Sequence, residues 1–246
     1  MGTFVLIHGA WHGDWCWDAV AATVRSAGHQ VVTPTLTGLG DRVGELNPDV
    51  GLDTHVLDVE NAVRTAGRRD VVLVGHSYAG MAVTGAAARL GDLVGRLVVV
   101  DGFLPERGET ALELLPERAA AHYRDSAAEI GDGWRVPPRP LANLGVTDQR
   151  VIDELAPRLT DHPFKTYTDR SQYGASELTV NGTYLLCSGW NSPFRPAAER
   201  AGALGWTVDE LDADHEVPVT DPELLAGALL RPATAGTGDS VEEASA

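Results

Sequence analysis

Short apolar runs rich in valine, leucine and isoleucine alternate along this chain with longer segments of helical periodicity. Most of the runs show no alternation with polar residues, which is typical of strands buried on both faces of a sheet. The helical segments between them provide the crossovers that parallel strands require. The pattern therefore predicts an α/β fold, a mostly parallel, doubly wound sheet with helices on both faces. The predicted strands occupy residues 3–7, 29–34, 70–74, 96–100, 183–187 and 206–211.

The alternation stops between residues 105 and 180, where prolines are frequent and the helical stretches, such as 109–128 and 147–158, are short. We expect residues 1–104 and 181–230 to form the core, and the insertion 105–180 to form a helical cap over one end of the sheet. Residues 231–246 are small or acidic and lack an apolar period, so this tail is predicted to be disordered.

The net charge of −16 argues against nucleic acid and anionic membranes as partners, because both would be repelled. No apolar run approaches the roughly 18 residues of a membrane span, and no signal peptide is evident, so a cytoplasmic protein is expected. Cys16 and Cys187 are predicted to be free buried thiols. No Cys/His cluster has metal-ligand spacing and no dinucleotide motif occurs, so neither metal nor cofactor is implied. A homodimer is left open.

The segment VVLVGHSYAG (71–80) carries an apolar strand straight into a serine, Ser77, flanked by small residues. A strand, the pattern Gly-x-Ser-x-small and then a helix describe a nucleophile elbow, in which a tight turn holds the serine out for reaction. Gly75 and Ala79 are small enough to let the strand and helix approach each other. The alternative is an ordinary strand-to-helix turn with a capping serine.

A serine nucleophile needs a base and donors for the oxyanion that forms on attack. His215 lies in a polar loop after the last predicted strand, where this chain order places the base. The loop after the first strand reads HGAWHG (8–13), and its glycines allow the backbone to approach a ligand closely. We expect the N–H of Ala10, or of Trp11, and the N–H of Tyr78 to form the oxyanion hole.

These motifs together resemble the α/β-hydrolase superfamily, and more narrowly the group of plant methylesterases and hydroxynitrile lyases with bacterial esterase-like relatives. The resemblance rests on residues 4–42, on GHSYAG (75–80) and on ELDADHEVPVTDPELL (210–225), and it is weakest in the insertion. It implies an α/β-hydrolase fold and a Ser-His-Asp triad. The plant members carry the acid after the strand equivalent to TYLLC, but here the loop 188–192 holds no carboxylate.

Other members of the superfamily take the acid from the end of the preceding strand, and here Asp101 directly follows RLVVV. A carboxylate at that place needs a partner, because an unpaired buried charge is costly. We therefore assign Asp101 as the acid that orients His215. Asp212 and Asp214 are rivals, although they lie very close to His215 along the chain. A strand-end aspartate that merely caps a turn is the remaining alternative.

The lyases of this group carry threonine where this chain has Gly9, and lysine where it has Glu216, which favours hydrolysis of a small-molecule ester over cyanide chemistry. The ester could be small, or carry a bulky or aromatic apolar group. Lactone opening or a lyase reaction on the same triad, and a non-catalytic binding protein, stay open as alternatives. The aromatic residues expected to line the substrate pocket under the cap are Trp11, Tyr78, Phe103, Trp134 and Trp190.

Overall fold

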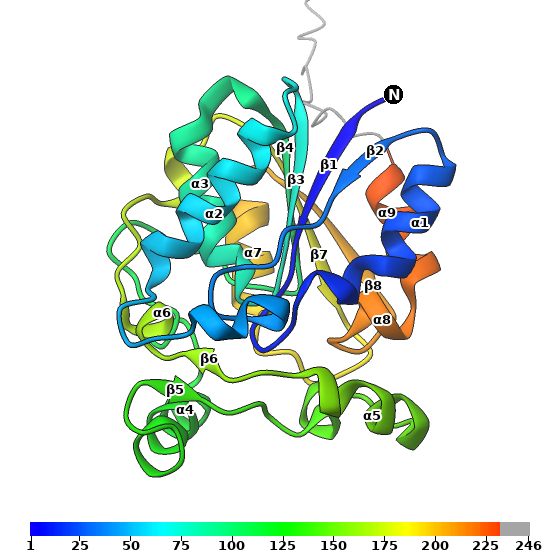
Figure 1. Ribbon diagram of the computed structural model, residues 1–246. Coiled ribbons are helices and arrows are strands. Elements are labelled where there is room, and N and C mark those ends of the chain that lie inside the picture. Colours follow the sequence, from blue (N-terminus) through cyan, green and yellow to red (C-terminus); the bar gives the residue numbers. More distant parts are fainter. Residues whose placement is uncertain (232–246) are drawn as a thin grey trace, which may run out of the picture.

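A six-stranded, fully parallel sheet forms the centre of the computed structural model, which describes residues 1–231 (Figure 1). The predicted tail therefore lies, except for Arg231, outside the described residues. The strand order is β2-β1-β3-β4-β7-β8, so the chain starts one strand in from an edge, β2 forms that edge, and the later strands follow in chain order on the other side of β1. The strands are β1 (Thr3–Ile7), β2 (Gln30–Val32), β3 (Val71–His76), β4 (Val94–Val100), β7 (Asn181–Cys187) and β8 (Thr207–Leu211).

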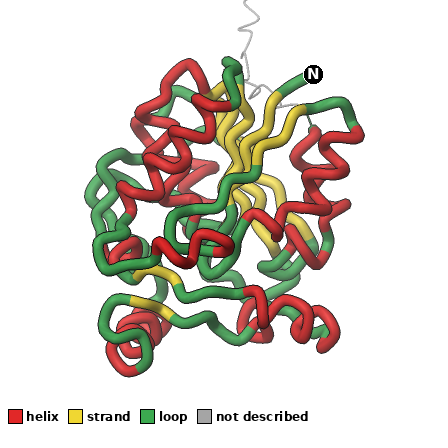
Figure 2. The backbone as a smooth tube through the Cα atoms, viewed as in Figure 1, coloured by secondary structure: helices red, strands yellow, loops and turns green. Residues whose placement is uncertain are grey.

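Helices cover both faces of this sheet, as Figures 1 and 2 show. Each helix places its apolar stripe on the sheet, and two hydrophobic clusters result, one on each face. The central strands β3 and β4 are buried on both sides, and each buried valine or leucine contributes roughly 1.5–3 kcal/mol. One face carries α1 (Asp18–Ser26), α8 (Val217–Thr220) and α9 (Pro222–Leu230), and the other carries α2 (Leu52–Thr65), α3 (Ala79–Leu90) and α7 (Arg195–Ala203).

The segment between β4 and β7 adds no strand to the large sheet. It holds a two-stranded antiparallel ribbon that sequence reasoning did not predict. Its elements are α4 (Glu117–Glu129), β5 (Arg135–Val136), α5 (Gln149–Leu155), β6 (His162–Pro163) and α6 (Lys165–Thr168). Its part from α4 to β6 lies beyond the carboxyl ends of the strands, and the chain after α6 runs back along the sheet to the start of β7 (Figure 1).

Both helices predicted in this segment are shorter than expected. Residues 111–114 form a turn instead, in which the side chains of Thr110 and Glu113 each accept the other's backbone N–H, at 3.2 and 2.9 Å. Pro116 disfavours a helical conformation of the residue before it. Helix α4 then begins directly after Pro116. Helix α5 gives way after Leu155 to a 3₁₀ turn that contains Pro157.

Within residues 1–231, no helix is long and apolar enough to cross a membrane. The fold has the predicted class, with each predicted core strand found within a few residues of its expected place. In open α/β sheets, ligands bind beyond the carboxyl ends of the strands. That edge, facing the segment 105–180, is therefore where the candidate site is sought.

Candidate active site

Ser77 lies in the tight turn between β3 and α3, with a left-handed φ of 57°. A non-glycine residue in this region is strained, and such strain gathers at functional sites. The turn also requires small neighbours. A Cβ on Gly75 would lie 2.7 Å from Cγ2 of Val83, and a Cβ on Gly80 would overlap the carbonyl oxygen of Phe103. The short pattern that predicted an elbow thus coincides with a turn that only small residues can form.

Ser77, His215 and Asp101 come together at this edge of the sheet. Nε2 of His215 lies 2.9 Å from Oγ of Ser77, and Nδ1 lies 2.6 Å from Oδ2 of Asp101. Because an ionised carboxylate can only accept, Nδ1 carries the hydrogen and donates it. Nε2 is then the unprotonated nitrogen and accepts the hydroxyl hydrogen of Ser77. This is the arrangement in which a histidine can remove the proton of a serine.

Asp101 is fully buried at the end of β4, and its charge is compensated by several donors besides His215. Oδ2 accepts from Nε1–H of Trp190 at 2.9 Å. Oδ1 accepts from the hydroxyl of Ser192 at 2.8 Å and from the N–H of Cys187 at 3.3 Å. The loop that lacks a carboxylate therefore supplies hydrogen bonds to a carboxylate from the neighbouring strand.

The two rival acids face elsewhere. Oδ1 of Asp214 accepts from the N–H of Glu216 and from the hydroxyl of Thr220, both at 2.8 Å, so its carboxylate closes its own turn. Burial raises the pKa of the Asp214 carboxyl. Asp212 is exposed to solvent. In the part of the chain that the structure describes, only Asp101 contacts Nδ1 of His215.

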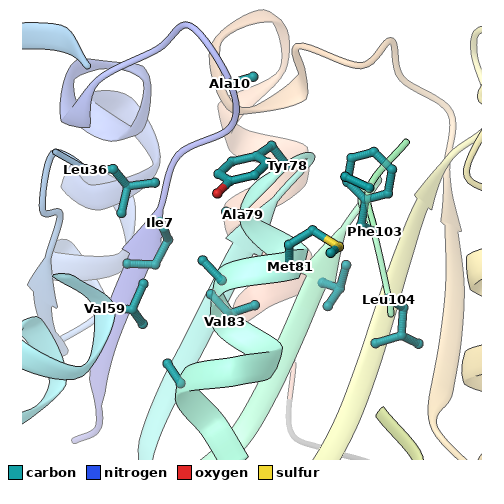
Figure 3. Close-up of a cluster of buried hydrophobic side chains, with 14 of the residues drawn as sticks. Ile7, Ala10, Leu36, Val59, Tyr78, Ala79, Met81, Val83, Phe103 and Leu104 are labelled. Carbon is teal, nitrogen blue, oxygen red and sulfur yellow. The ribbon is translucent and has the colours of Figure 1, made fainter. Parts of the chain in front are cut away.

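The backbone on either side of Ala10 is held by neighbouring histidines. Nδ1–H of His8 donates to the carbonyl of Gly9 at 2.8 Å, and Nε2 of His8 accepts the N–H of Leu36 at 3.0 Å. Burial lowers the pKa of His8 to about 3, so this ring is neutral. Among residues 1–231, the N–H groups of Ala10 and Tyr78 have no protein acceptor. They remain available as donors, and both residues lie in the buried cluster drawn in Figure 3.

His215 is fixed through its backbone as well as through its ring. Its carbonyl accepts Nε2–H of His76, the residue before the serine, at 2.8 Å. Its N–H donates to the carbonyl of Leu144, in the segment 105–180, at 3.1 Å. Burial lowers the pKa of His76 to about 3, so His76 acts as a neutral donor. Sequence reasoning did not predict this contact.

Trp190 and Phe103 lie beside the triad, as expected of site residues. The Trp190 ring is 4.9 Å from that of His215, and its indole N–H is committed to Asp101. Phe103 packs edge-on against Phe194, whose ring stacks on His215 at 5.7 Å. Phe194 was not predicted, because a single phenylalanine in a loop carries no local signal.

In the described part of the chain, the side chains of the other three predicted pocket residues, Trp11, Tyr78 and Trp134, contact other parts of the protein and not the triad side chains. Trp11 is buried, has a φ of 67° and donates its indole N–H to the carbonyl of Val136 at 2.9 Å, so it binds the segment 105–180 to the loop after β1. The Tyr78 ring is fully buried, and its hydroxyl donates to Nδ1 of His55 at 2.9 Å. Trp134 packs against the guanidinium of its neighbour Arg135. No contact in residues 1–231 joins Trp134 to the triad, and we do not retain it as a site residue.

An open cavity of about 800 Å³ lies between the segment 105–180 and the loop after β7, and Trp190 is part of its wall. Trp190 thus separates this space from His215. The polar residues that line the cavity include Arg118, His122, Arg139, Asn143 and Asn191.

Among residues 1–231, no group of three or more His, Cys, Asp or Glu side chains is arranged to hold a metal ion.

Known proteins resemble this chain over almost the whole of its described length. The model of the alpha/beta hydrolase family matches residues 4–228. A carbendazim hydrolyzing esterase from Nocardioides sp. is 37% identical over 93% of this chain and 98% of its own length. Esterase PIR7B of rice is also 37% identical, over 93% and 94%. These relatives confirm the prediction of an esterase-type enzyme.

Solved structures show the same fold. An extracellular alpha/beta-hydrolase from a Paenibacillus species superimposes with a TM-score of 0.81 at 21% identity, covering 92% of this chain and 97% of that one. A methylesterase from Arabidopsis gives a TM-score of 0.73 at 20% identity, covering 94% and 98%. With a family match that spans nearly the whole described chain, the protein belongs to the alpha/beta hydrolase family.

Proposed function

We propose that the protein hydrolyses carboxylic esters through a covalent acyl-enzyme on Ser77. The observation that carries the proposal is the unbroken line of hydrogen bonds from Ser77 through His215 to Asp101. His215 removes the hydroxyl proton as Oγ attacks the ester carbonyl, and then delivers that proton to the leaving alcohol. Asp101 holds the reactive tautomer and stabilises the imidazolium. Water, activated by His215, then releases the acid and restores Ser77.

The N–H groups of Ala10 and Tyr78 are proposed to bind the oxyanion of both tetrahedral intermediates. One such donor typically contributes about 3–4 kcal/mol to the reaction. A side chain at position 9 would crowd this place, because a Cβ on Gly9 would lie 2.9 Å from Cβ of Ser77. Glu216, by contrast, forms an ion pair with His12, which compensates the negative charge of its carboxylate near the site. The case for hydrolysis over cyanide chemistry therefore rests on Gly9.

The substrate is proposed to be an ester with an aromatic or bulky apolar group, because Trp190, Phe103 and Phe194 surround the triad. The Nocardioides relative acts on carbendazim, and relatives in Arabidopsis are methylesterases. Carbendazim and methyl esters of aromatic acids therefore belong in the first substrate panel, beside 4-nitrophenyl acetate and butyrate.

Steady-state hydrolysis by the parent, Ser77→Ala and Ser188→Ala tests the proposal. Ser188 is an exposed serine at the end of β7 whose hydroxyl donates to the carbonyl of Leu211, so it serves as the matched control. We expect Ser77→Ala to lose at least roughly 10⁴-fold in kcat. Ser188→Ala should keep the parent rate within a factor of about two. Equal hydrolysis by the parent and Ser77→Ala would overturn the proposal.

A further inference from the structure

A buried ion pair joins the loop of the oxyanion donors to the turn of the catalytic histidine. Nε2 of His12 lies 2.9 Å from Oε2 of Glu216, and the two side chains are only 3% and 2% exposed. His12 belongs to the loop after β1, whereas Glu216 directly follows His215 near the other end of the chain. A buried carboxylate without its partner would be strongly destabilising, so the two loops are held together.

His12 is held on its other side by the oxyanion loop itself. Its Nδ1 donates to the carbonyl of Ala10 at 2.7 Å. One ring nitrogen faces a carbonyl and the other a carboxylate, an arrangement that favours the doubly protonated imidazolium. The carbonyl of Gly9 is bound by His8, so both peptide planes that flank Ala10 are clamped. In a trans peptide the N–H points opposite to the C=O, so the His8 bond to the Gly9 carbonyl sets the direction of the Ala10 N–H. The His12 bond holds the next peptide unit, and with it the position of residue 10 in the loop.

Glu216 is held by the turn that carries the base. Its N–H donates to Oδ1 of Asp214 at 2.8 Å, and its own side chain reaches across to His12. A small displacement of Glu216 would therefore move His215 relative to Ala10. The two groups that must meet the same substrate carbonyl, base and oxyanion donor, are linked through one ion pair.

We propose that His12 and Glu216 are positioning residues, whose buried ion pair fixes the Ala10 N–H relative to Ser77 and His215. The inference rests on the proposed function, because it assigns the oxyanion donor of that same site. Neither side chain touches the substrate. The pair acts by holding two loops in the geometry that the transition state requires, and this sensitivity to placement is general in enzymes.

The two members of the pair each stabilise the charged form of the other. Burial opposes the charge of His12, but the Glu216 carboxylate outweighs it and raises the pKa of the imidazole above its usual value. Burial likewise opposes the charge of Glu216, and His12 lowers the pKa of that carboxyl to about 2. The other ionisable groups that interact electrostatically with His12 or Glu216 are His8, Cys16, His76, Cys187, Asp214 and His215.

The test compares Glu216→Gln with Glu60→Gln. Glu60 is a matched control, since it is also buried and paired, at 3.2 Å with Arg89, but it lies on α2 away from the triad. Both variants should lose thermal stability. We expect Glu216→Gln to lose roughly 10- to 100-fold in kcat on the best ester of the panel, with KM changed less than about threefold. Glu60→Gln should keep the parent kcat.

A double variant, His12→Gln with Glu216→Gln, keeps the test independent of folding. It leaves no unpaired buried charge, so it should regain much of the stability lost by Glu216→Gln. Its kcat should nevertheless stay roughly tenfold or more below that of the parent, because two amides hold the loops less firmly. The ¹⁵N resonances of His12 should show a doubly protonated ring at pH 7 in the parent and a neutral one in Glu216→Gln.

A folded Glu216→Gln, or the double variant, with a kcat within twofold of the parent would overturn the inference. A rise in KM at constant kcat would also overturn it, since that would place the pair in ground-state binding. Labelling of Ser77 by a fluorophosphonate gives a second rate for every variant. If the parent is labelled but hydrolyses no ester, the proposed function fails. The role of the ion pair is then tested by comparing the labelling rates of the variants with that of the parent. If the parent is not labelled, both proposals fail.

Discussion

Replacing Asp101 by asparagine removes the charge of the proposed acid with almost no change of shape. Asparagine tolerates the left-handed φ of 39° at this position better than other residues do. Its amide must conflict with one fixed donor, because Oδ2 receives Nε1–H of Trp190 and Oδ1 receives the N–H of Cys187. The longer contact, 3.3 Å to Cys187, is the weaker one and is expected to be given up. The amide oxygen then still faces His215.

The main loss in Asp101→Asn is therefore the carboxylate charge beside the imidazolium that forms during reaction. Two unit charges about 4 Å apart interact by about 4 kcal/mol at an effective dielectric constant of 20, which corresponds to a roughly 10³-fold loss in kcat. If the amide turns the other way, its N–H₂ favours the unreactive tautomer of His215 and the loss is larger, up to roughly 10⁴-fold.

Ester hydrolysis and fluorophosphonate labelling by the parent, Asp101→Asn and Asp214→Asn measure this effect. Asp214→Asn is the control, because within residues 1–231 this side chain does not contact Nδ1 of His215, and the amide oxygen of asparagine can still accept from the N–H of Glu216 and the hydroxyl of Thr220. It should keep kcat within a few-fold of the parent. The reasoning is refuted if Asp101→Asn retains more than about a tenth of the parent kcat while folded, or if Asp214→Asn loses as much.

Three further predictions concern the surroundings of the triad. Trp190→Phe loses the N–H to Asp101 but keeps a ring in the cavity wall, so it should lose roughly tenfold in kcat on all esters. Trp190→Ala should also shift the substrate preference toward bulky esters. Equal losses on small and bulky esters in Trp190→Ala would contradict the role of Trp190 as part of the cavity wall. Gly9→Ala should lower kcat roughly 100-fold by crowding Ser77, while Gly44→Ala, in open space, should not; the rates of ester hydrolysis decide this. The free energy of unfolding should fall steeply below pH 6.5, by up to about 5 kcal/mol per pH unit, because the unfolded chain protonates imidazoles that stay neutral when folded. Urea titrations from pH 7.5 to 5 measure this slope. A slope that corresponds to the uptake of less than one proton on unfolding would contradict the prediction. The imidazoles whose pKa is lowered by burial are His8, His55, His76 and His162.

The sign of this pH dependence follows from the direction of each shift. A histidine whose pKa is lowered on folding binds fewer protons than the unfolded chain does, so stability rises with pH until the unfolded pKa is passed. His12 behaves in the opposite way. Its pKa is raised, so its contribution is present below pH 6.5 and is lost as the pH rises through its folded pKa. Glu216 contributes above pH 4.5 and loses this as the pH falls toward about 2.

The sheet could be predicted because its strands carry their own signal. In β3 and β4, valines and leucines follow one another without polar alternation, and only burial on both faces explains such runs. The segment 105–180 has no comparable signal. Its helices are short, and prolines such as Pro116 and Pro157 decide where they begin and end.

The residues of the candidate site were accessible to sequence reasoning only where chain order restricts the choice. Ser77 and His215 follow strands in a fixed order, and Asp101 follows a buried strand that leaves a charge in need of a partner. The pair of His12 and Glu216 gives no such signal, since its members come from distant loops and meet only in the fold. An aromatic residue such as Trp134 is equally compatible with a pocket or with surface packing.

Rapid acid quenching of the parent with 4-nitrophenyl acetate, followed by peptide mapping by mass spectrometry, tests the central claim most directly. The account predicts one acetyl group on the peptide that contains Ser77, formed within the first turnover, and none in Ser77→Ala. Hydrolysis of the ester without an acetyl group on Ser77, at a time when turnover is under way, would contradict a covalent mechanism. An acetyl group found instead on another residue would reject Ser77 as the nucleophile.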